Sequence, residues 1–305
     1  MPIANDDGRG AKARVMAAPD FLQNPAVKTW LGGVEPAWTL LDRTSFAALH
    51  RPPSPAAGAI RLAYDLTYDE VQQSAVVRNA LILLRAAAQG PGLKMTATGN
   101  LSRGVVAEMC ERFEWPDFDR TEAFQLHKVV NEPDFLPLYF VRHVAALAKL
   151  LRPRKGYLKT SQIGRQVLDQ PRSGALQAIL FHLTFWYIDL GYFGPGLLHG
   201  WPQRDAGVVL WSLSIAAGDW QSRERLTRLC TIPIDDVLGA TWDRASYAME
   251  ARILQPLRWF GLLEHRQDDI PGNRFEKHHF YRKTALFDRF LSFDVQLAGA
   301  GTPRH

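Results

Sequence analysis

The chain has 305 residues, of which 47% are hydrophobic and 22% are charged, a balance typical of a folded protein with two or three small domains. This composition excludes a wholly disordered or fibrous protein, and the formal charge of +5 permits nucleic-acid binding without requiring it. Cys110 and Cys230 are isolated, which argues against a disulfide framework or a zinc knuckle. No run of about eighteen apolar residues and no signal peptide occur, so we expect a cytoplasmic protein without membrane contacts.

Apolar residues recur at helical spacing through most of the chain, and strand patterns are confined to short pieces beside turns. The sequence therefore predicts a mainly α fold with small β-hairpins. The clearest predicted helices are 71–88, 136–151, 176–190 and 245–263. Breaks rich in Pro and Gly divide the chain into segments. We interpret these as a disordered tail (1–19), a helical lead-in with a Pro-rich linker (20–58), a degenerate repeat (59–115), a repeat with a basic hairpin (116–170), a helical connector (171–222), a third repeat (223–298) and a tail (299–305).

One phrase appears three times: a helical run, a short gap, and a Lys-x-Thr/Ser signal that starts another helix. The copies are Leu93 to Gly99, Leu158 to Gly164 and, more loosely, Tyr281 to Phe287. This order indicates tandem winged-helix-like repeats joined by helical segments.

The second copy has the full set of signals. Residues 121–130 predict one helix, Pro133 ends it, and a second helix follows to about Leu150. The turn Pro153-Arg154-Lys155-Gly156 then predicts a tight hairpin with a basic tip, after which Ser161 or Thr160 caps the next helix. The first copy keeps only Gly90-Pro91-Gly92 in place of a hairpin. The third predicts helices at 234–242 and 244–260, followed by a longer, partly acidic tip at 268–273.

Two resemblances follow from these motifs. The passage from a helix through a basic turn into Leu158-Lys159-Thr160 resembles winged-helix repressors of the multiple-antibiotic-resistance type, over roughly forty residues. That resemblance implies a winged helix-turn-helix fold and DNA binding. The segment Leu93 to Glu108, with Thr96-Ala97-Thr98-Gly99-Asn100-Leu101-Ser102-Arg103, is similar to uncharacterised bacterial proteins, some of them joined to domains carried on mobile elements.

For DNA, the second repeat would place the helix 136–150 in the major groove and the cations of its hairpin on phosphates. The predicted DNA-binding residues are Arg142, Lys149, Arg152, Arg154, Lys155, Lys159 and Arg165, and His143 is a further candidate. The helix itself is too apolar to read many bases. A cationic face that also includes Arg223, Arg225 and Arg228 would favour double-stranded DNA, whereas an apolar or acidic groove between repeats would favour a protein partner.

The main functional prediction is a DNA-binding regulator or mobile-element accessory factor. The alternative is an interaction protein or homo-oligomer in which the repeats are packing modules. An enzyme is a third possibility, although no catalytic motif or phosphate loop occurs. No cofactor is expected. His265, His278 and His279 invite a metal hypothesis, but adjacent residues on a strand face opposite ways, so we predict surface or partner-contact roles and no metal site.

Overall fold

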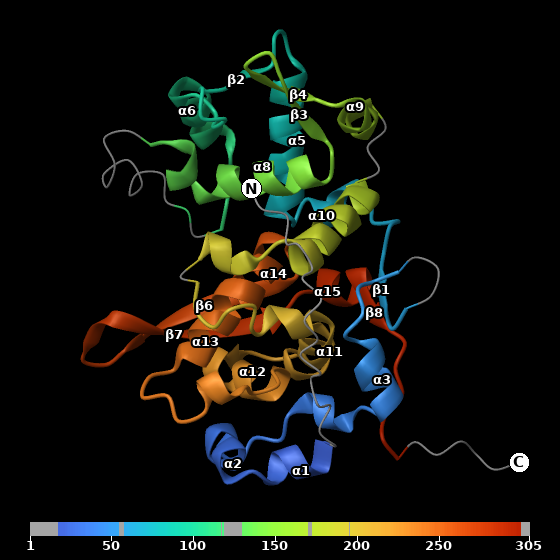
Figure 1. The fold of residues 1–305 in the computed structure, drawn as a ribbon, viewed down its shortest axis with the longest axis vertical. Coiled ribbons are helices and arrows are strands. Elements are labelled where there is room, and N and C mark those ends of the chain that lie inside the picture. Colours follow the sequence, from blue (N-terminus) through green and yellow to red (C-terminus); the bar gives the residue numbers. More distant parts are fainter. Residues whose placement is uncertain are drawn as a thin grey trace, which may run out of the picture.

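The computed structural model describes residues 18–54, 58–116, 118, 130–169, 173–194 and 196–299 (Figure 1). Helices dominate, and the strands form small antiparallel sheets, so the prediction of a mainly α chain with small hairpins is confirmed. Within these ranges no helix has both the length and the apolar character needed to cross a membrane. The predicted tail at 1–19 lies outside the described residues except for its last two, which begin the first helix.

The N-terminal lead-in lies at one end of the molecule (Figure 1). It contains α1 (Ala18–Gln23), α2 (Pro25–Leu31), the 3-10 turn η1 (Ala37–Leu40) and α3 (Arg43–Ala48). The buried Trp38 indole donates to the carbonyl of Thr231 at 3.0 Å. The strand β1 (Ile60–Leu62) pairs with β8 (Leu291–Phe293), and this pairing joins the two ends of the described chain.

A first unit occupies the opposite end (Figure 1). After the short α4 (Tyr68–Val71), its elements are α5 (Ala75–Ala88), β2 (Leu93–Lys94), α6 (Arg103–Arg112), the 3-10 turn η2 (Glu132–Asp134), α8 (Leu136–Leu147), β3 (Leu151–Arg154), β4 (Tyr157–Thr160) and α9 (Gln162–Asp169). Its three strands form one antiparallel sheet in the order β2-β4-β3. The long helix α10 (Ser173–Tyr187) and the 3-10 turn η3 (Leu190–Phe193) lead away from it.

A second unit repeats this order of elements. It contains α11 (Ala206–Ala216), β5 (Gln221–Ser222), α12 (Arg223–Cys230), α13 (Arg244–Met249), the π-helical turn η6 (Glu250–Leu254), α14 (Gln255–Trp259), β6 (Leu263–Ile270), β7 (Asn273–Lys283) and α15 (Ala285–Phe290). Its sheet has the order β5-β7-β6, so in both units the last strand lies between the other two. The hairpin β6–β7 projects from the side of the molecule (Figure 1).

The two units also make equivalent hydrogen bonds where the helix leads into the hairpin. Lys149 and Gly261 both end the helix with positive φ, at 59° and 74°. The hydroxyl of Ser161 donates to the Lys149 carbonyl at 2.7 Å, and that of Thr284 donates to the Gly261 carbonyl at 2.8 Å. The backbone N–H groups of the same two residues donate to Leu150 and Leu262 at 2.9 and 3.0 Å. Residues 149–161 therefore correspond to 261–284, with a longer hairpin in the second unit.

This correspondence changes the interpretation of the threefold phrase. Lys159 and Arg282 lie near the ends of equivalent strands, whereas Lys94 lies in β2, the first strand of its sheet. The phrase thus occurs at equivalent positions twice and not three times. Because β2 pairs with β4, the predicted segments 59–115 and 116–170 share one sheet. Likewise β5, which the prediction placed in the connector, pairs with β7 of the third segment.

The prediction of a helix at 234–242 was wrong, because only a 3-10 turn, η5 (Asp235–Val237), forms there. The Pro233 and Gly239 that flank it are residues that stop helices. The helix expected at 121–130 falls outside the described residues apart from Val130.

One hydrophobic core runs through both units, since one packed cluster includes buried residues of each unit, with members from Ala37 to Leu291. Aromatic rings join the units directly: the ring of Trp259 in the second lies 5.0 Å from that of Phe140 and 5.4 Å from that of Trp115 in the first. The two units are therefore packed against each other and are not separate domains joined only by a linker.

Candidate nucleic-acid interface

The hairpin β3–β4 of the first unit has a basic tip. A two-residue turn, Lys155-Gly156, connects the strands, and both turn residues have positive φ, at 50° and 77°. Such a turn matches the twist of paired strands and favours glycine in its second position. The predicted tight basic hairpin is confirmed.

Alternation along the strands places most of the hairpin's cations on the outer side of the sheet. Leu151, Leu158 and Thr160 are buried against the core. On the other face Arg152 lies opposite Lys159, and Arg154 lies opposite Tyr157, whose other neighbour is Lys94 of β2. We call Lys94, Arg152, Arg154, Lys155 and Lys159 the basic face. All are exposed except Lys159, which is half-buried.

The charges of the basic face are not neutralised within the described chain, where none of the five cations forms an ion pair. Arg152 and Lys159 are direct cross-strand neighbours, and like charges in that position destabilise a hairpin, by up to about 1 kcal/mol. An anion bound across the two strands would remove this repulsion.

The second hairpin shows the opposite arrangement at the equivalent position. There Glu264 lies opposite Arg282, and the guanidinium contacts the carboxylate at 2.6 Å. Arg266 pairs with Asp268 at 3.2 Å, and Lys277 pairs with Asp269 at 3.6 Å. These three cations of the second hairpin are therefore paired, while those of the first are presented to solvent.

Two further predicted contacts flank the basic face. Lys149 is exposed at the end of α8, in the left-handed conformation that the second unit gives to Gly261. That conformation costs a residue with a β-carbon about 1–2 kcal/mol. Arg165 is exposed on α9, whose first turn is capped by Ser161, the hydroxyl of which accepts from the Gly164 N–H at 3.0 Å. Of the two predicted capping residues, Ser161 is therefore the correct one.

Arg142 and His143 are placed differently from the other candidates. The Arg142 guanidinium donates to both carboxylate oxygens of Glu132, at 2.6 and 2.5 Å, and to the carbonyl of Gly99 at 2.7 Å. The Glu132 side chain is fully buried and that of Arg142 is only 16% exposed. Burial lowers the pKa of His143, which favours its neutral form. Neither residue offers a free positive charge to a phosphate.

The helix α8 packs inward along most of its length. Buried side chains include Leu138, Phe140, Val141 and Val144. Part of the remaining surface meets the turn η3, since the hydroxyl of Tyr139 donates to that of Tyr192 at 3.0 Å. Burial and this hydrogen bond raise the pKa of Tyr139 to about 12. The helix thus presents few polar groups that could meet base edges.

The cations of α12 do not extend the basic face. Arg223 is buried and pairs with Glu250 at 2.7 Å. Arg228 donates to the carbonyls of Trp30 and Glu224 at 3.0 and 3.1 Å. Only Arg225 of the three predicted cations is exposed, and α12 lies far from the first hairpin (Figure 1). The continuous cationic face expected to include Arg223, Arg225 and Arg228 therefore does not form.

A family comparison matches this same unit. Residues 72–173 match the Y4jL N-terminal domain family. The chain is 32% identical over 114 residues to the uncharacterised protein y4jL of Sinorhizobium fredii (strain NBRC 101917 / NGR234), an alignment that covers 37% of this chain and 51% of that protein. The chain thus spans about half the length of this curated relative. No solved structure matches the chain.

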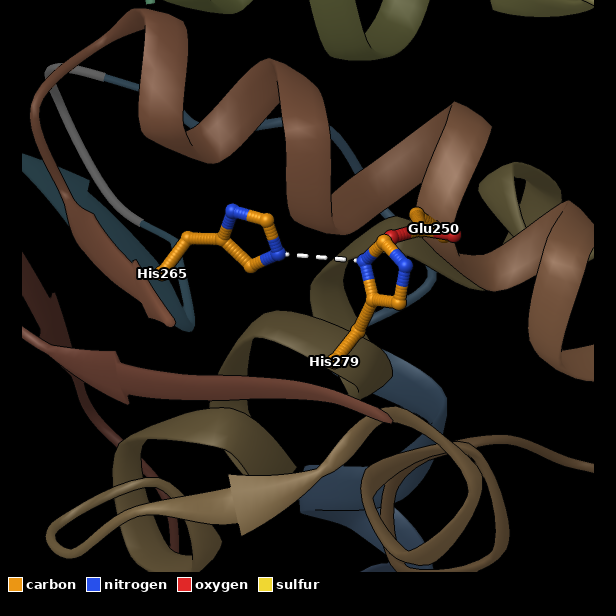
Figure 2. Close-up of side chains that lie close together, drawn as sticks. All are labelled: Glu250, His265 and His279. Carbon is orange, nitrogen blue, oxygen red and sulfur yellow. Dashed lines mark hydrogen bonds and ion pairs between the residues drawn. The ribbon is translucent and has the colours of Figure 1, made fainter. Parts of the chain in front are cut away.

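A second cluster, made of two imidazoles and a carboxylate, lies where the β6–β7 hairpin meets η6. His265 and His279 point toward each other and toward Glu250 (Figure 2), and their ligand atoms and that of Glu250 all lie within 4.8 Å of one another. The surface or partner-contact roles expected for these histidines stay a prediction: His265 and His279 are half-buried, and of the three only His278 is exposed. The adjacent residues do face opposite ways, as predicted.

The sequence analysis did not predict Lys94 as part of the basic face or Glu250 as a neighbour of the histidines. Lys94 could have been assigned to the basic face by the alternation of Leu93 and Lys94 in a short strand, had the pairing of β2 with β4 been known. Glu250 stands in a helical run far from the histidines, and no local spacing connects it to them. Only the tertiary fold brings that carboxylate under the hairpin.

Proposed function

We propose that this chain binds double-stranded DNA through the basic face of its first unit, and that both units are winged-helix modules. The shared order of helices and strands, with the last strand in the middle of each sheet, supports the second part. The observation that carries the first part is the contrast between the hairpins: the cations of the first lack ion-pair partners within the described residues, whereas the second pairs Arg266, Lys277 and Arg282.

The proposed mode of binding relies on phosphates. Exposed cations on the first hairpin would contact the backbone of a duplex, and release of its counterions would supply the affinity. Because α8 is apolar and partly covered by η3, few direct contacts with base edges are available to it. We therefore expect binding with low sequence selectivity and steep salt dependence, as suits an accessory factor more than a narrowly selective regulator.

The test is a measurement of affinity for random-sequence duplex DNA at several salt concentrations. The variant Arg152→Ala/Arg154→Ala/Lys155→Ala/Lys159→Ala should bind more weakly than the wild type. Its plot of log affinity against log salt should lose about 3 to 4 units of slope, since each phosphate contact contributes about 0.9.

A charge-matched control removes four exposed cations that lie away from the first hairpin: Lys28, Arg43, Arg51 and Arg225. This variant should keep the slope of the wild type. A wild type without salt-dependent binding, or equal losses in the two variants, would contradict the assignment of the basic face.

A protein-interaction role is the second candidate and suits the second unit. Its hairpin neutralises its own charges, and two aromatic side chains near the start of α13 stay exposed, Trp242 at 50% and Tyr247 at 37%. Such side chains are common anchors in protein interfaces. In this arrangement one unit contacts DNA and the other holds a partner or a second copy.

A further inference from the structure

The cluster at the base of the second hairpin contains a hydrogen-bonding conflict. His279 Nδ1 lies 2.9 Å from Glu250 Oε1 and 3.1 Å from His265 Nε2 (Figure 2). A ring nitrogen carries either one hydrogen or one in-plane lone pair. If it donates to the carboxylate, its single hydrogen cannot also make a full bond to His265. If it accepts from His265, two lone pairs face each other across the contact with Glu250.

A cation among the three atoms would resolve this conflict, since each would then direct a lone pair at it. The three come from separate elements: Glu250 from η6, His265 from β6 and His279 from β7. Two imidazoles and one carboxylate form a ligand set suited to Zn²⁺ and related transition metals rather than to Mg²⁺ or Ca²⁺, which prefer oxygen.

Two neighbouring side chains orient the Glu250 carboxylate so that it can act as a metal ligand. Arg223 donates to Glu250 Oε2 at 2.7 Å, which leaves Oε1 facing the histidines, and the Tyr281 hydroxyl donates to Oε1 at 2.5 Å. Partners of this kind orient the ligands of metal sites and tune their affinity.

The backbone and the packing also fix these side chains. Glu250 begins a π-helical turn between α13 and α14, and π turns are rare insertions found frequently at functional sites. The His265 ring stacks on the ring of Tyr281, with centroids 4.7 Å apart and planes inclined by 24°. The ligand set is thus preorganised, while the His279 side chain stays 21% exposed and can be reached from solvent.

We propose that Glu250, His265 and His279 bind one divalent transition-metal ion, with Zn²⁺ as the best match to the ligand set. The ion would tie both strands of the second hairpin to the helix beneath it, and three protein ligands would leave a coordination position open to water or to another donor. This site is separate from the basic face, and its existence does not depend on DNA binding.

The experiment is a titration of the chelator-treated full chain with Co²⁺, which gives visible absorption bands when it is bound in a tetrahedral site, followed by displacement with Zn²⁺. We expect one equivalent of Co²⁺ to bind, Zn²⁺ to displace it, and excess Mg²⁺ to have no effect. The variants His265→Ala and His279→Ala should each lose at least about tenfold in affinity.

The control variant is His278→Ala, which removes an exposed imidazole next to His279 and should bind the metal as the wild type does. Circular dichroism establishes that each variant is folded, and Glu250→Gln replaces any that is not. The basic-face variant should keep the metal site, so failure of DNA binding and failure of this proposal are distinguishable. Absence of stoichiometric binding by the wild type, or an equal loss in His278→Ala, would overturn the proposal.

Discussion

Arg142 matches the sequence pattern of a DNA contact, yet in the structure it stabilises the protein interior by pairing with Glu132. Its sequence position, on the helix before a basic hairpin, is the one expected for a DNA contact. In the structure its guanidinium neutralises a carboxylate that has no solvent exposure, and that carboxylate also accepts from the Leu101 N–H at 2.6 Å. Arg142 therefore links α8 to the loop before α6, and we assign it a structural role.

The variant Arg142→Met should lose about 3 to 5 kcal/mol in the free energy of unfolding, because it leaves the Glu132 carboxylate buried without its partner. Urea denaturation provides the measurement. The double variant Arg142→Met/Glu132→Gln should recover part of that loss, since it removes the buried charge as well. In the folded variant the salt dependence of DNA binding should stay unchanged. A loss of stability below about 1 kcal/mol, or a slope reduced by about one unit, would instead indicate a phosphate contact.

At the scale of elements, the two hairpins are equivalent in topology but differ in charge, because the first is basic and the second pairs cations with acidic residues. The sequence predicted this difference, because Lys-Gly at a tip and a run of Asp at another are local signals. It did not predict the sheets, since β2 and β5 are only two residues long and their pairing depends on contacts distant in sequence. Local chemistry thus predicted the hairpins, and long-range packing determined the units.

The like-charged pair of the first hairpin leads to a prediction about stability. The variant Arg152→Thr/Lys159→Thr should raise the free energy of unfolding by up to about 1 kcal/mol, because cross-strand repulsion disappears and threonine suits a strand. The same variant should weaken DNA binding. The matched control is Glu264→Thr/Arg282→Thr in the second hairpin, where removal of an ion pair should leave stability equal or lower. A destabilised first-hairpin variant would show that these cations serve the fold.

For the whole molecule, the sequence correctly predicted a mainly helical chain with small hairpins, but it divided the chain too finely. The segments 59–115 and 116–170 were separated by composition, yet they share the sheet β2-β4-β3. Glycines and prolines mark turns equally well inside a unit and between units. Chain breaks alone therefore could not indicate which helices pack together. The cluster of Glu250 with two histidines could not be predicted either, because packing between distant elements brings its members together.

The shared core predicts that the two units unfold together. Trp259 is 6% exposed and contacts Trp115 and Phe140 of the first unit, so Trp259→Ala removes contacts from both. We expect a loss of about 3 to 5 kcal/mol, since truncating a buried tryptophan leaves a large cavity. Hydrogen exchange followed in peptides of α5 and of α11 should show protection lost in parallel. The control Trp242→Ala truncates a half-exposed tryptophan of the second unit and should change stability by less than about 0.5 kcal/mol. Should α5 remain protected in Trp259→Ala while α11 opens, the first unit would be an independent folding domain, and the basic face could be isolated from the second unit.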